Sequence, residues 1–200
     1  RPTRNSQGEL IHPTKDGIQR FWQWFGDSKV VDANGKPLVV YHGSPTSGIT
    51  EFRGGITAYG IFFTDSLDSA VYYNPSASRR NPSSEDVYSV YLKAENPADL
   101  RNPRVLRAIL EEAGRLDEES EIADYIERGE LYTYDGKGRI QDEIVRTAEG
   151  MGYDAVILPD MTSGDLANSY VVFRPEQIKS ATGNLGTFDP SDARIIASES

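Results

Sequence analysis

Cysteine is absent from this chain, and histidine is scarce. None of the 200 residues is a cysteine, which excludes disulfides, thiolate zinc sites and cysteine nucleophiles. The two histidines, His12 and His42, are too few for a metal centre built from several histidines. We therefore expect the chemistry of this chain to need no metal.

Long apolar runs are also missing. No stretch approaches the roughly 18 apolar residues that a membrane-spanning helix needs. Residues 1–6 are polar and lack the apolar core of a signal peptide. The chain begins with Arg1 and not with methionine. We expect it to be part of a longer polypeptide that does not associate with a membrane.

Positive charge is in deficit. Lys and Arg number 21 against 31 Asp and Glu, which gives a formal net charge of −10 and a pI near 4.7. Proteins that bind nucleic acids usually present a basic face, because neutralising phosphates supplies most of their affinity. The composition therefore disfavours a nucleic-acid partner. Acidic side chains gather between Glu111 and Glu130, which we interpret as a solvated helical face.

Several motifs of catalysis and phosphate binding are absent as well. The chain contains neither common glycine-rich phosphate loop, nor the Gly-x-Ser-x-Gly elbow of hydrolases, nor a defensible Ser/His/Asp order. No pair of carboxylates has a spacing typical of an acid and base couple. Asp160, Asp165 and Glu176 lie near late strands and are weak candidates, each better explained as a surface carboxylate.

The residues that are present suit one domain that mixes helices and strands. Ile18, Phe21, Trp22 and Phe25 recur with the spacing of an amphipathic helix, which Gly26 can end. The other expected elements are a hairpin over 30–41, strands over 60–64, 87–94, 154–158 and 170–173, and a helical block over about 103–150. Residues 1–13 are predicted to be a tail or linker, 44–59, 74–86 and 159–168 loops, and 191–200 a tail. This order indicates an α+β domain.

His42 stands at the end of an apolar strand and is followed by Gly43. A neutral imidazole donates one hydrogen bond and accepts another, and the glycine lets a ligand approach the backbone groups at the strand end. The aromatic side chains that could stack beside it are Phe62, Phe63, Tyr72 and Tyr73. From spacing alone, the alternatives are a structural histidine and a set of core aromatics.

Three ordered blocks of the sequence carry a family resemblance. They are residues 41–44 (Tyr-His-Gly-Ser), 60–64 with 69–73, and 169–173 with Gln177 and Ile178. The blocks resemble the three motifs of the His-Tyr-Glu group of ADP-ribosyltransferases, which includes diphtheria toxin and the poly-ADP-ribose polymerases. Residues 21–31, 175–181 and 184–190 are similar to one branch, the ADP-ribosyltransferase domains of phage polyvalent proteins and related mobile-element proteins.

The resemblance covers about residues 14–190 and implies a split β-sandwich into which the helical block is inserted. It also implies NAD as the substrate. In the family, the histidine of the first motif bonds a ribose hydroxyl of the adenosine half of NAD, and that role falls on His42. Backbone groups of the next residue, Gly43, hold the nicotinamide amide. Ser44 completes the motif and is expected to line the NAD site.

Two aromatic rings enclose the nicotinamide in this family. The first matches Phe62, where many relatives have tyrosine, and the second matches Tyr72 or Tyr73, because the spacing is ambiguous by one residue. Phe63 and Thr64 follow in the same strand and are expected to bind NAD with them. Stacking strains the glycosidic bond and shields it from water, and the bond then breaks with oxocarbenium character at the ribose.

The third motif departs from the family pattern. Relatives carry a glutamate that bonds the 2′-hydroxyl of the reacting ribose and stabilises the cation, and Ser169 holds that position here. Losing such a preorganised charge costs about 10²–10³ in rate. Transfer could still proceed slowly, Glu176 or Asp165 could supply the charge from a neighbouring turn, or the site could bind NAD or ADP-ribose without turnover. The candidate catalytic residues are His42, Tyr72, Ser169 and Glu176.

The function that the sequence predicts is mono-ADP-ribosyl transfer from NAD to a host protein. A nucleic-acid acceptor is less favoured because of the negative charge of the chain. The alternatives are NAD hydrolysis and a catalytically weakened NAD-binding or ADP-ribose-binding module of a virion. The predicted location is the host cytoplasm, reached as part of a phage or mobile-element polypeptide.

Overall fold

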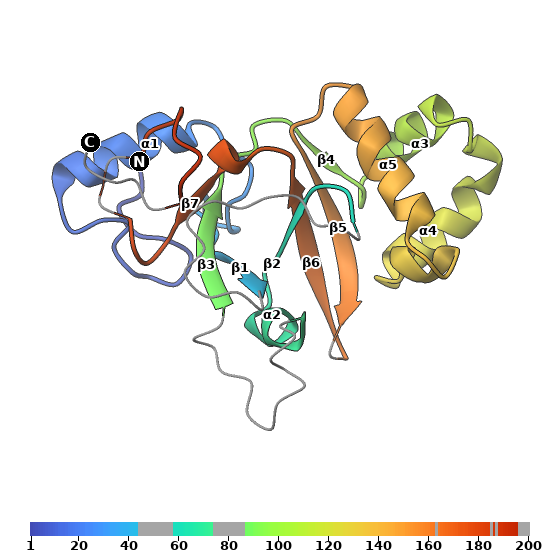
Figure 1. Cartoon of the computed structure of the whole chain (residues 1–200), viewed down its shortest axis with the longest axis horizontal. Helices are drawn as coiled ribbons and strands as arrows, with labels where there is room; N and C mark the ends of the chain where they lie inside the picture. Colours follow the sequence, from blue (N-terminus) through green and yellow to red (C-terminus); the bar gives the residue numbers. More distant parts are fainter. Residues whose placement is uncertain (44–57, 74–86, 163, 185, 187, 196–200) are drawn as a thin grey trace.

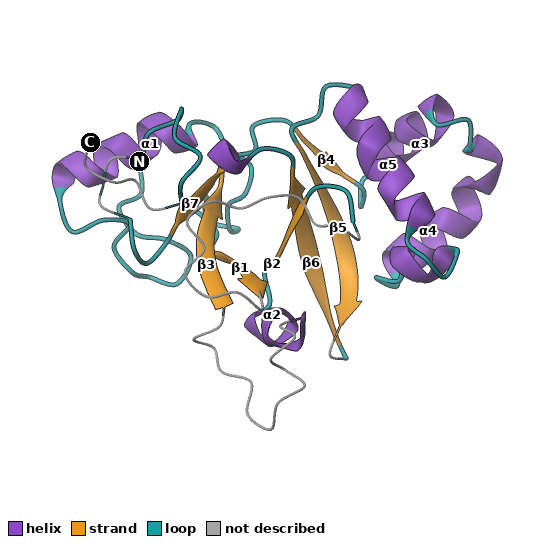
Figure 2. Ribbon diagram, viewed as in Figure 1, coloured by secondary structure: helices purple, strands orange, loops and turns teal. Residues whose placement is uncertain are grey.

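The computed structural model describes residues 1–43, 58–73, 87–162, 164–184, 186 and 188–195 (Figure 1). Its helices are α1 (Lys15–Phe25), α2 (Leu67–Tyr73), α3 (Pro103–Glu112), α4 (Glu119–Glu127) and α5 (Arg139–Gly150), with short 3₁₀ helices at Leu116–Glu118, Leu131–Tyr134 and Pro175–Gln177. Its strands are β1 (Val40–Gly43), β2 (Ile61–Thr64), β3 (Val87–Leu92), β4 (Pro97–Asp99), β5 (Ala155–Thr162), β6 (Asp165–Val172) and β7 (Ile178–Ser180). This mixture confirms the α+β class (Figure 2). The predicted loop over 74–86 and most of the one over 44–59 lie outside the described residues.

The strands form a seven-stranded sheet in the order β4-β5-β6-β2-β1-β3-β7. Neighbours pair antiparallel, except for β4 and β5, which are parallel. Within the described residues, β1 and β2 share one register pair, Tyr41 with Thr64, whereas β2 and β6 share four. The sheet therefore divides between β1 and β2 into a β4-β5-β6-β2 half and a β1-β3-β7 half.

Helices cover the two halves differently (Figure 1). Helices α3, α4 and α5, which we call the helical block together with the 3₁₀ turns between them, pack on the β4-β5-β6-β2 half. Because side chains alternate across a strand, Val156 and Val171 face this block while Ala155 and Val172 join the core on the opposite face. Helix α1 packs instead on the β1-β3-β7 half, against Tyr91 of β3.

The helical block begins where its sequence predicts. The Asn102 side chain accepts a hydrogen bond from the Arg104 N–H at 3.0 Å, and Pro103 occupies the first turn, where a missing N–H is harmless. Leu106, Ile109 and Leu110 bury the inner face of α3. The acidic side chains between residues 111 and 130 are mostly exposed or half-buried, which agrees with a solvated helical face.

The buried aromatic face of α1 differs from the predicted one at a single tryptophan. Phe21 and Phe25 are buried as expected, but Trp24 is also fully buried, while Trp22 is only partly so. Thr14 begins the helix, because its Oγ1 accepts from the Gly17 N–H at 3.0 Å.

Residues 1–13 and 191–195, the described parts of the two predicted tails, pack on the domain, contrary to the expectation from their polar composition. Ile11 is 5% exposed within the aromatic cluster of α1. Asn5 is buried, and its side chain donates to the Tyr91 hydroxyl at 3.1 Å. At the other end, Ile195 is buried and its carbonyl accepts from the Ser180 N–H at 2.8 Å. Single apolar anchors and backbone bonds hold these segments in place.

The sequence also underestimates the strands of the late hairpin. The predicted loop over 159–168 is instead a ribbon, because β5 and β6 pair continuously from Ala155 with Val172 to Thr162 with Asp165. The predicted hairpin over 30–41 shrinks to a tight turn with one bridge, between Val31 and Pro37.

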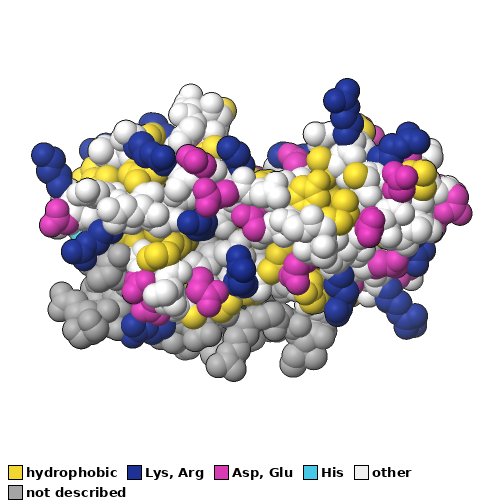
Figure 3. Space-filling view, turned by 90° about the horizontal axis from the view of Figure 1, so that it is seen from above, with side chains coloured by type: hydrophobic (Ala, Val, Ile, Leu, Met, Phe, Trp, Pro, Cys, Tyr) yellow, Lys and Arg dark blue, Asp and Glu magenta, His cyan; other side chains and the backbone are white. Residues whose placement is uncertain are grey.

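Basic and acidic side chains are interspersed on the face seen in Figure 3, without a patch of one sign. Among the residues that the structure describes, no helix has the length and apolar character needed to cross a bilayer.

Candidate active site

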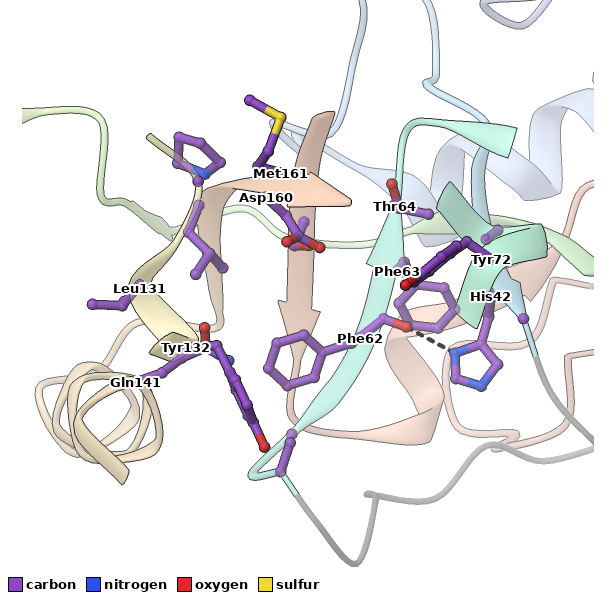
Figure 4. A pocket seen from close by; sticks show the side chains of 18 of the residues that line it. His42, Phe62, Phe63, Thr64, Tyr72, Leu131, Tyr132, Gln141, Asp160 and Met161 are labelled. Carbon is purple, nitrogen blue, oxygen red and sulfur yellow. Dashed lines mark hydrogen bonds between the residues drawn. The ribbon is translucent and has the colours of Figure 1, made fainter. Parts of the chain in front are cut away.

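A cavity of about 680 Å³ opens at the division of the sheet, between β1, β2, α2, the β5-β6 ribbon and the helical block (Figure 4). It brings together seven of the residues that the sequence singles out: His42, Gly43, Phe62, Phe63, Thr64, Tyr72 and Ser169. Ser44 and the side chain of Tyr73 lie outside the described residues. The structure thus supports one shared site for motifs that are far apart in the sequence.

Strand register explains why these side chains meet. Thr64 of β2 and Leu158 of β5 both pair with Ser169 of β6, so the three residues share one face of the sheet. Phe62 and Asp160 lie two residues from Thr64 and Leu158 and therefore face the same way. The helical block covers the part of this face around Val156 and Val171 and leaves the rest open as the cavity.

His42 is fixed at the end of β1. Its Nδ1 lies 2.7 Å from the carbonyl oxygen of Phe62, which can only accept, so Nδ1 carries the proton. Burial lowers the pKa of His42 below its usual 6.5, and the Phe62 hydrogen bond opposes this only in part. The imidazole is thus neutral at pH 7, with Nε2 as a hydrogen-bond acceptor.

Of the two tyrosines of α2, the structure describes the side chain of Tyr72. Tyr72 lines the cavity and is 64% exposed, as a ring that receives a ligand should be. Figure 4 places Tyr72 and His42 on one side of Phe62, and Tyr132 and Gln141 on the other. Phe62 is therefore the central ring of the cavity, and the structure supports Tyr72 as its partner.

Ser169 meets a carboxylate that the sequence did not favour. Its hydroxyl Oγ lies 3.4 Å from Oδ2 of Asp160, and both residues line the cavity. Asp160 looked like a surface carboxylate because residues 159–168 carry turn-like polar residues. Only the strand pairing between β5 and β6 places it beside Ser169, and no local sequence signal gives that register.

Glu176, one of the candidate catalytic residues, is not among the described residues that line the cavity. It lies in the 3₁₀ turn Pro175–Gln177 beyond the end of β6, where its carbonyl accepts from the Trp24 indole N–H at 3.0 Å. Asp165 is exposed at the opposite end of β6. Neither carboxylate is among the described residues that line the cavity.

The helical block supplies the far wall of the cavity, a role that the sequence did not predict. Leu131, Tyr132 and Gln141 line it. The wall is joined to β5 at Gly129, whose carbonyl accepts from the Met161 N–H at 2.9 Å. A Cβ at Gly129 would lie 2.5 Å from that nitrogen, and its φ of +72° also requires glycine. The block is thus part of the site.

Charge in the described cavity wall is negative. Among the described lining residues, none is Lys or Arg, and the carboxylates are Asp160 and Glu130. Glu130 is paired with Arg128, with Nε and Oε2 3.5 Å apart.

A divided sheet with a histidine and aromatic rings around one cavity is the arrangement that the resemblance implies for an ADP-ribosyltransferase. The model of a known family, ADP-ribosyltransferase in polyvalent proteins, matches residues 32–188, which is more than half of the chain. The chain therefore belongs to this family.

Other comparisons add little. No curated protein matches the chain. A solved structure titled "Crystal structure of an anti-CRISPR protein" is similar at a TM-score of 0.42 and 16% sequence identity, over 68% of this chain and 88% of that chain.

Proposed function

We propose that this domain transfers a single ADP-ribose unit from NAD to a host macromolecule, in the first instance a protein. One observation supports this most. His42, Phe62, Tyr72 and Ser169, which come from four different elements, line one cavity in a chain that belongs to an ADP-ribosyltransferase family.

The proposed reaction breaks the bond between C1′ of the ribose and the pyridinium nitrogen of nicotinamide. Both electrons of that bond leave with nicotinamide, which becomes neutral. An acceptor nucleophile then donates an electron pair to the cationic C1′ and releases its proton to water. The chain needs to supply binding, orientation and charge placement, and these need no metal.

The cavity provides groups suited to each part of this substrate. Phe62 and Tyr72 offer ring faces for the flat pyridinium, and Nε2 of His42 can accept from a ribose hydroxyl. The negative wall suits the pyridinium and the cation that follows it, and it is unfavourable for the pyrophosphate. We therefore assign the walls around Asp160 and Phe62 to the nicotinamide riboside half of NAD, and His42 to the ribose of the adenosine half.

Surface chemistry beside the cavity favours a protein acceptor. Met161 and Leu166 face each other across the β5-β6 ribbon and are 42% and 56% exposed. Exposed apolar side chains suit a protein surface better than a phosphate backbone. The net charge of −10 opposes nucleic acid as well. The proposed setting is the host cytoplasm, with the domain acting as part of a larger phage polypeptide.

The test incubates the chain with labelled NAD and a host lysate, beside a His42→Ala chain as control. Label on a discrete protein band that is lost in the control supports the proposal. Free ADP-ribose without a labelled band indicates hydrolysis, with water as the acceptor. Unchanged NAD, together with no binding by calorimetry, contradicts an NAD-dependent function.

A further inference from the structure

The carboxylate of Asp160 stands next to the position at which the family glutamate is missing. Asp160 pairs with Ala167, and Leu158 pairs with Ser169, so Asp160 and Ser169 lie on neighbouring strands and on the same face. The hydroxyl of Ser169 lies 3.4 Å from Oδ2 of Asp160. Both side chains line the cavity beside Phe62.

The backbone around Asp160 is held rigidly. The next residue, Met161, donates its N–H to the carbonyl of Gly129 at 2.9 Å, and β5 is paired with β6 on its other edge. Ser169 is 7% exposed, so its hydroxyl has few orientations available. A carboxylate on such a strand is placed more accurately than one on a turn, because the helical block at Gly129 and strand β6 hold the two edges of β5.

We propose that Asp160 is the catalytic carboxylate of this domain, and that it does from β5 what a glutamate at position 169 does in relatives. This inference rests on the proposed NAD-dependent function. The Ser169 hydroxyl donates a hydrogen bond to Asp160 and accepts one from a hydroxyl of the reacting ribose. The negative charge then lies across from C1′, where positive charge develops as nicotinamide leaves with the bonding electrons.

Other described carboxylates fit this role less well. Glu130 is exposed at the rim, and the structure shows no hydrogen bond between it and Ser169. Glu176 and Asp165 lie outside the described lining of the cavity. Asp160 therefore lines the cavity, and its carboxylate contacts Ser169 from a paired strand, since Asp160 lies on β5 and Ser169 on β6.

The first experiment replaces the charge and keeps the shape. Asp160→Asn should lower the rate of nicotinamide release from NAD about 10²–10³-fold. The affinity for NAD, measured by calorimetry, should change less than about threefold, because an asparagine oxygen can still accept from Ser169. Asp165→Asn is the matched control, since it removes an exposed carboxylate of the same ribbon outside the cavity. Melting temperatures verify that both variants are folded.

The second experiment moves the charge back to the family position. The double variant Ser169→Glu, Asp160→Asn should release nicotinamide at least tenfold faster than Asp160→Asn alone, because a carboxylate again faces C1′. Ser169→Glu alone should give no gain, because two adjacent carboxylates do not both ionise readily. A structural role of Asp160 would produce neither pattern.

Each outcome separates this inference from the proposed function. If the unmodified chain releases nicotinamide and Asp160→Asn does so equally fast, the inference about Asp160 is wrong and the function stands. A rate loss with Glu130→Gln but not with Asp160→Asn would assign the charge to the helical block and overturn the inference. If the unmodified chain neither binds NAD nor releases nicotinamide, the proposed function itself fails.

Discussion

The two halves of the sheet bury their side chains to different extents. On the β1-β3-β7 half, Phe21, Trp24 and Phe25 of α1 are 0% exposed against Tyr91 and Phe188. On the β4-β5-β6-β2 half, the helical block seals the sheet only in part, and the remainder of that face is a cavity.

This difference separates stability from binding within one small domain. A closed aromatic cluster makes many van der Waals contacts and leaves no space for a ligand. An open face gives up such contacts, and the exposed surface of Phe62 and Tyr72 is available for a substrate ring. We therefore expect substitutions in the aromatic cluster of α1 to change folding and those at the cavity to change NAD binding.

The largest effect on stability is expected from Phe21→Ala. Phe21 contacts the rings of Phe25 and Tyr91 at centroid distances of 4.9 and 5.0 Å. Removing it should lower the free energy of unfolding by about 3–5 kcal/mol, which urea denaturation measures. Phe62→Ala, at the half-buried ring of the cavity, should cost less than half as much stability and weaken NAD binding instead. Equal losses of stability would contradict the separation of the two halves.

The next largest effect is expected on NAD affinity in His42→Ala. The change removes the acceptor Nε2 and the Nδ1 bond to the Phe62 carbonyl, and a lost buried hydrogen bond of this kind costs about 1–3 kcal/mol. The Kd for NAD should therefore rise about 5- to 150-fold. His12→Ala is the control: His12 lies beside Thr14 at the start of α1 and is not among the described cavity residues, so the Kd should not change. Unaltered affinity in His42→Ala would remove His42 from the site.

The sequence predicted the local features of both halves more successfully than their pairing. Helix α1 and the Asn102 cap depend on neighbours along the chain, and both were found, although the buried face of α1 includes Trp24 in place of Trp22. Strand β4 is only three residues long, and the outer part of the β5-β6 ribbon is rich in polar residues, so neither showed a strand pattern. Strand β4 is held by pairing with β5, which is distant in sequence, and the outer ribbon by backbone pairing across one hairpin; side-chain periodicity reports neither.

The candidate site was predictable only where a motif marks it. His42, Phe62 and Tyr72 came from the family resemblance, and the structure gathers them in one cavity. Asp160 could not be found in this way, because its significance depends on the register between β5 and β6. The wall formed by Tyr132 depends in turn on how the helical block docks at Gly129, which composition alone does not reveal.

A smaller effect should distinguish the two tyrosines of α2. Tyr72→Ala removes a ring that lines the cavity and should weaken NAD binding by about 0.5–1.5 kcal/mol, whereas Tyr72→Phe keeps the ring face and should leave the affinity nearly unchanged. Tyr73→Ala, assayed by the same calorimetry, is the comparison that assigns the stacking role. A greater loss at position 73 than at position 72 would transfer that role to Tyr73.

The smallest effect is a pH dependence of stability that arises at His42. Burial lowers its pKa from 6.5, so below pH 6.5 the unfolded chain binds a proton that the folded chain does not. The free energy of unfolding should therefore fall as the pH decreases through 6.5, and this contribution should level off below the folded pKa. His42→Gln keeps a donor for the Phe62 carbonyl but cannot titrate, so the difference between the two chains isolates the effect from carboxylates that titrate at lower pH. If that difference does not change between pH 7.5 and 5.5, His42 is not buried in its neutral form, and this edge of the cavity is more solvated than its geometry indicates.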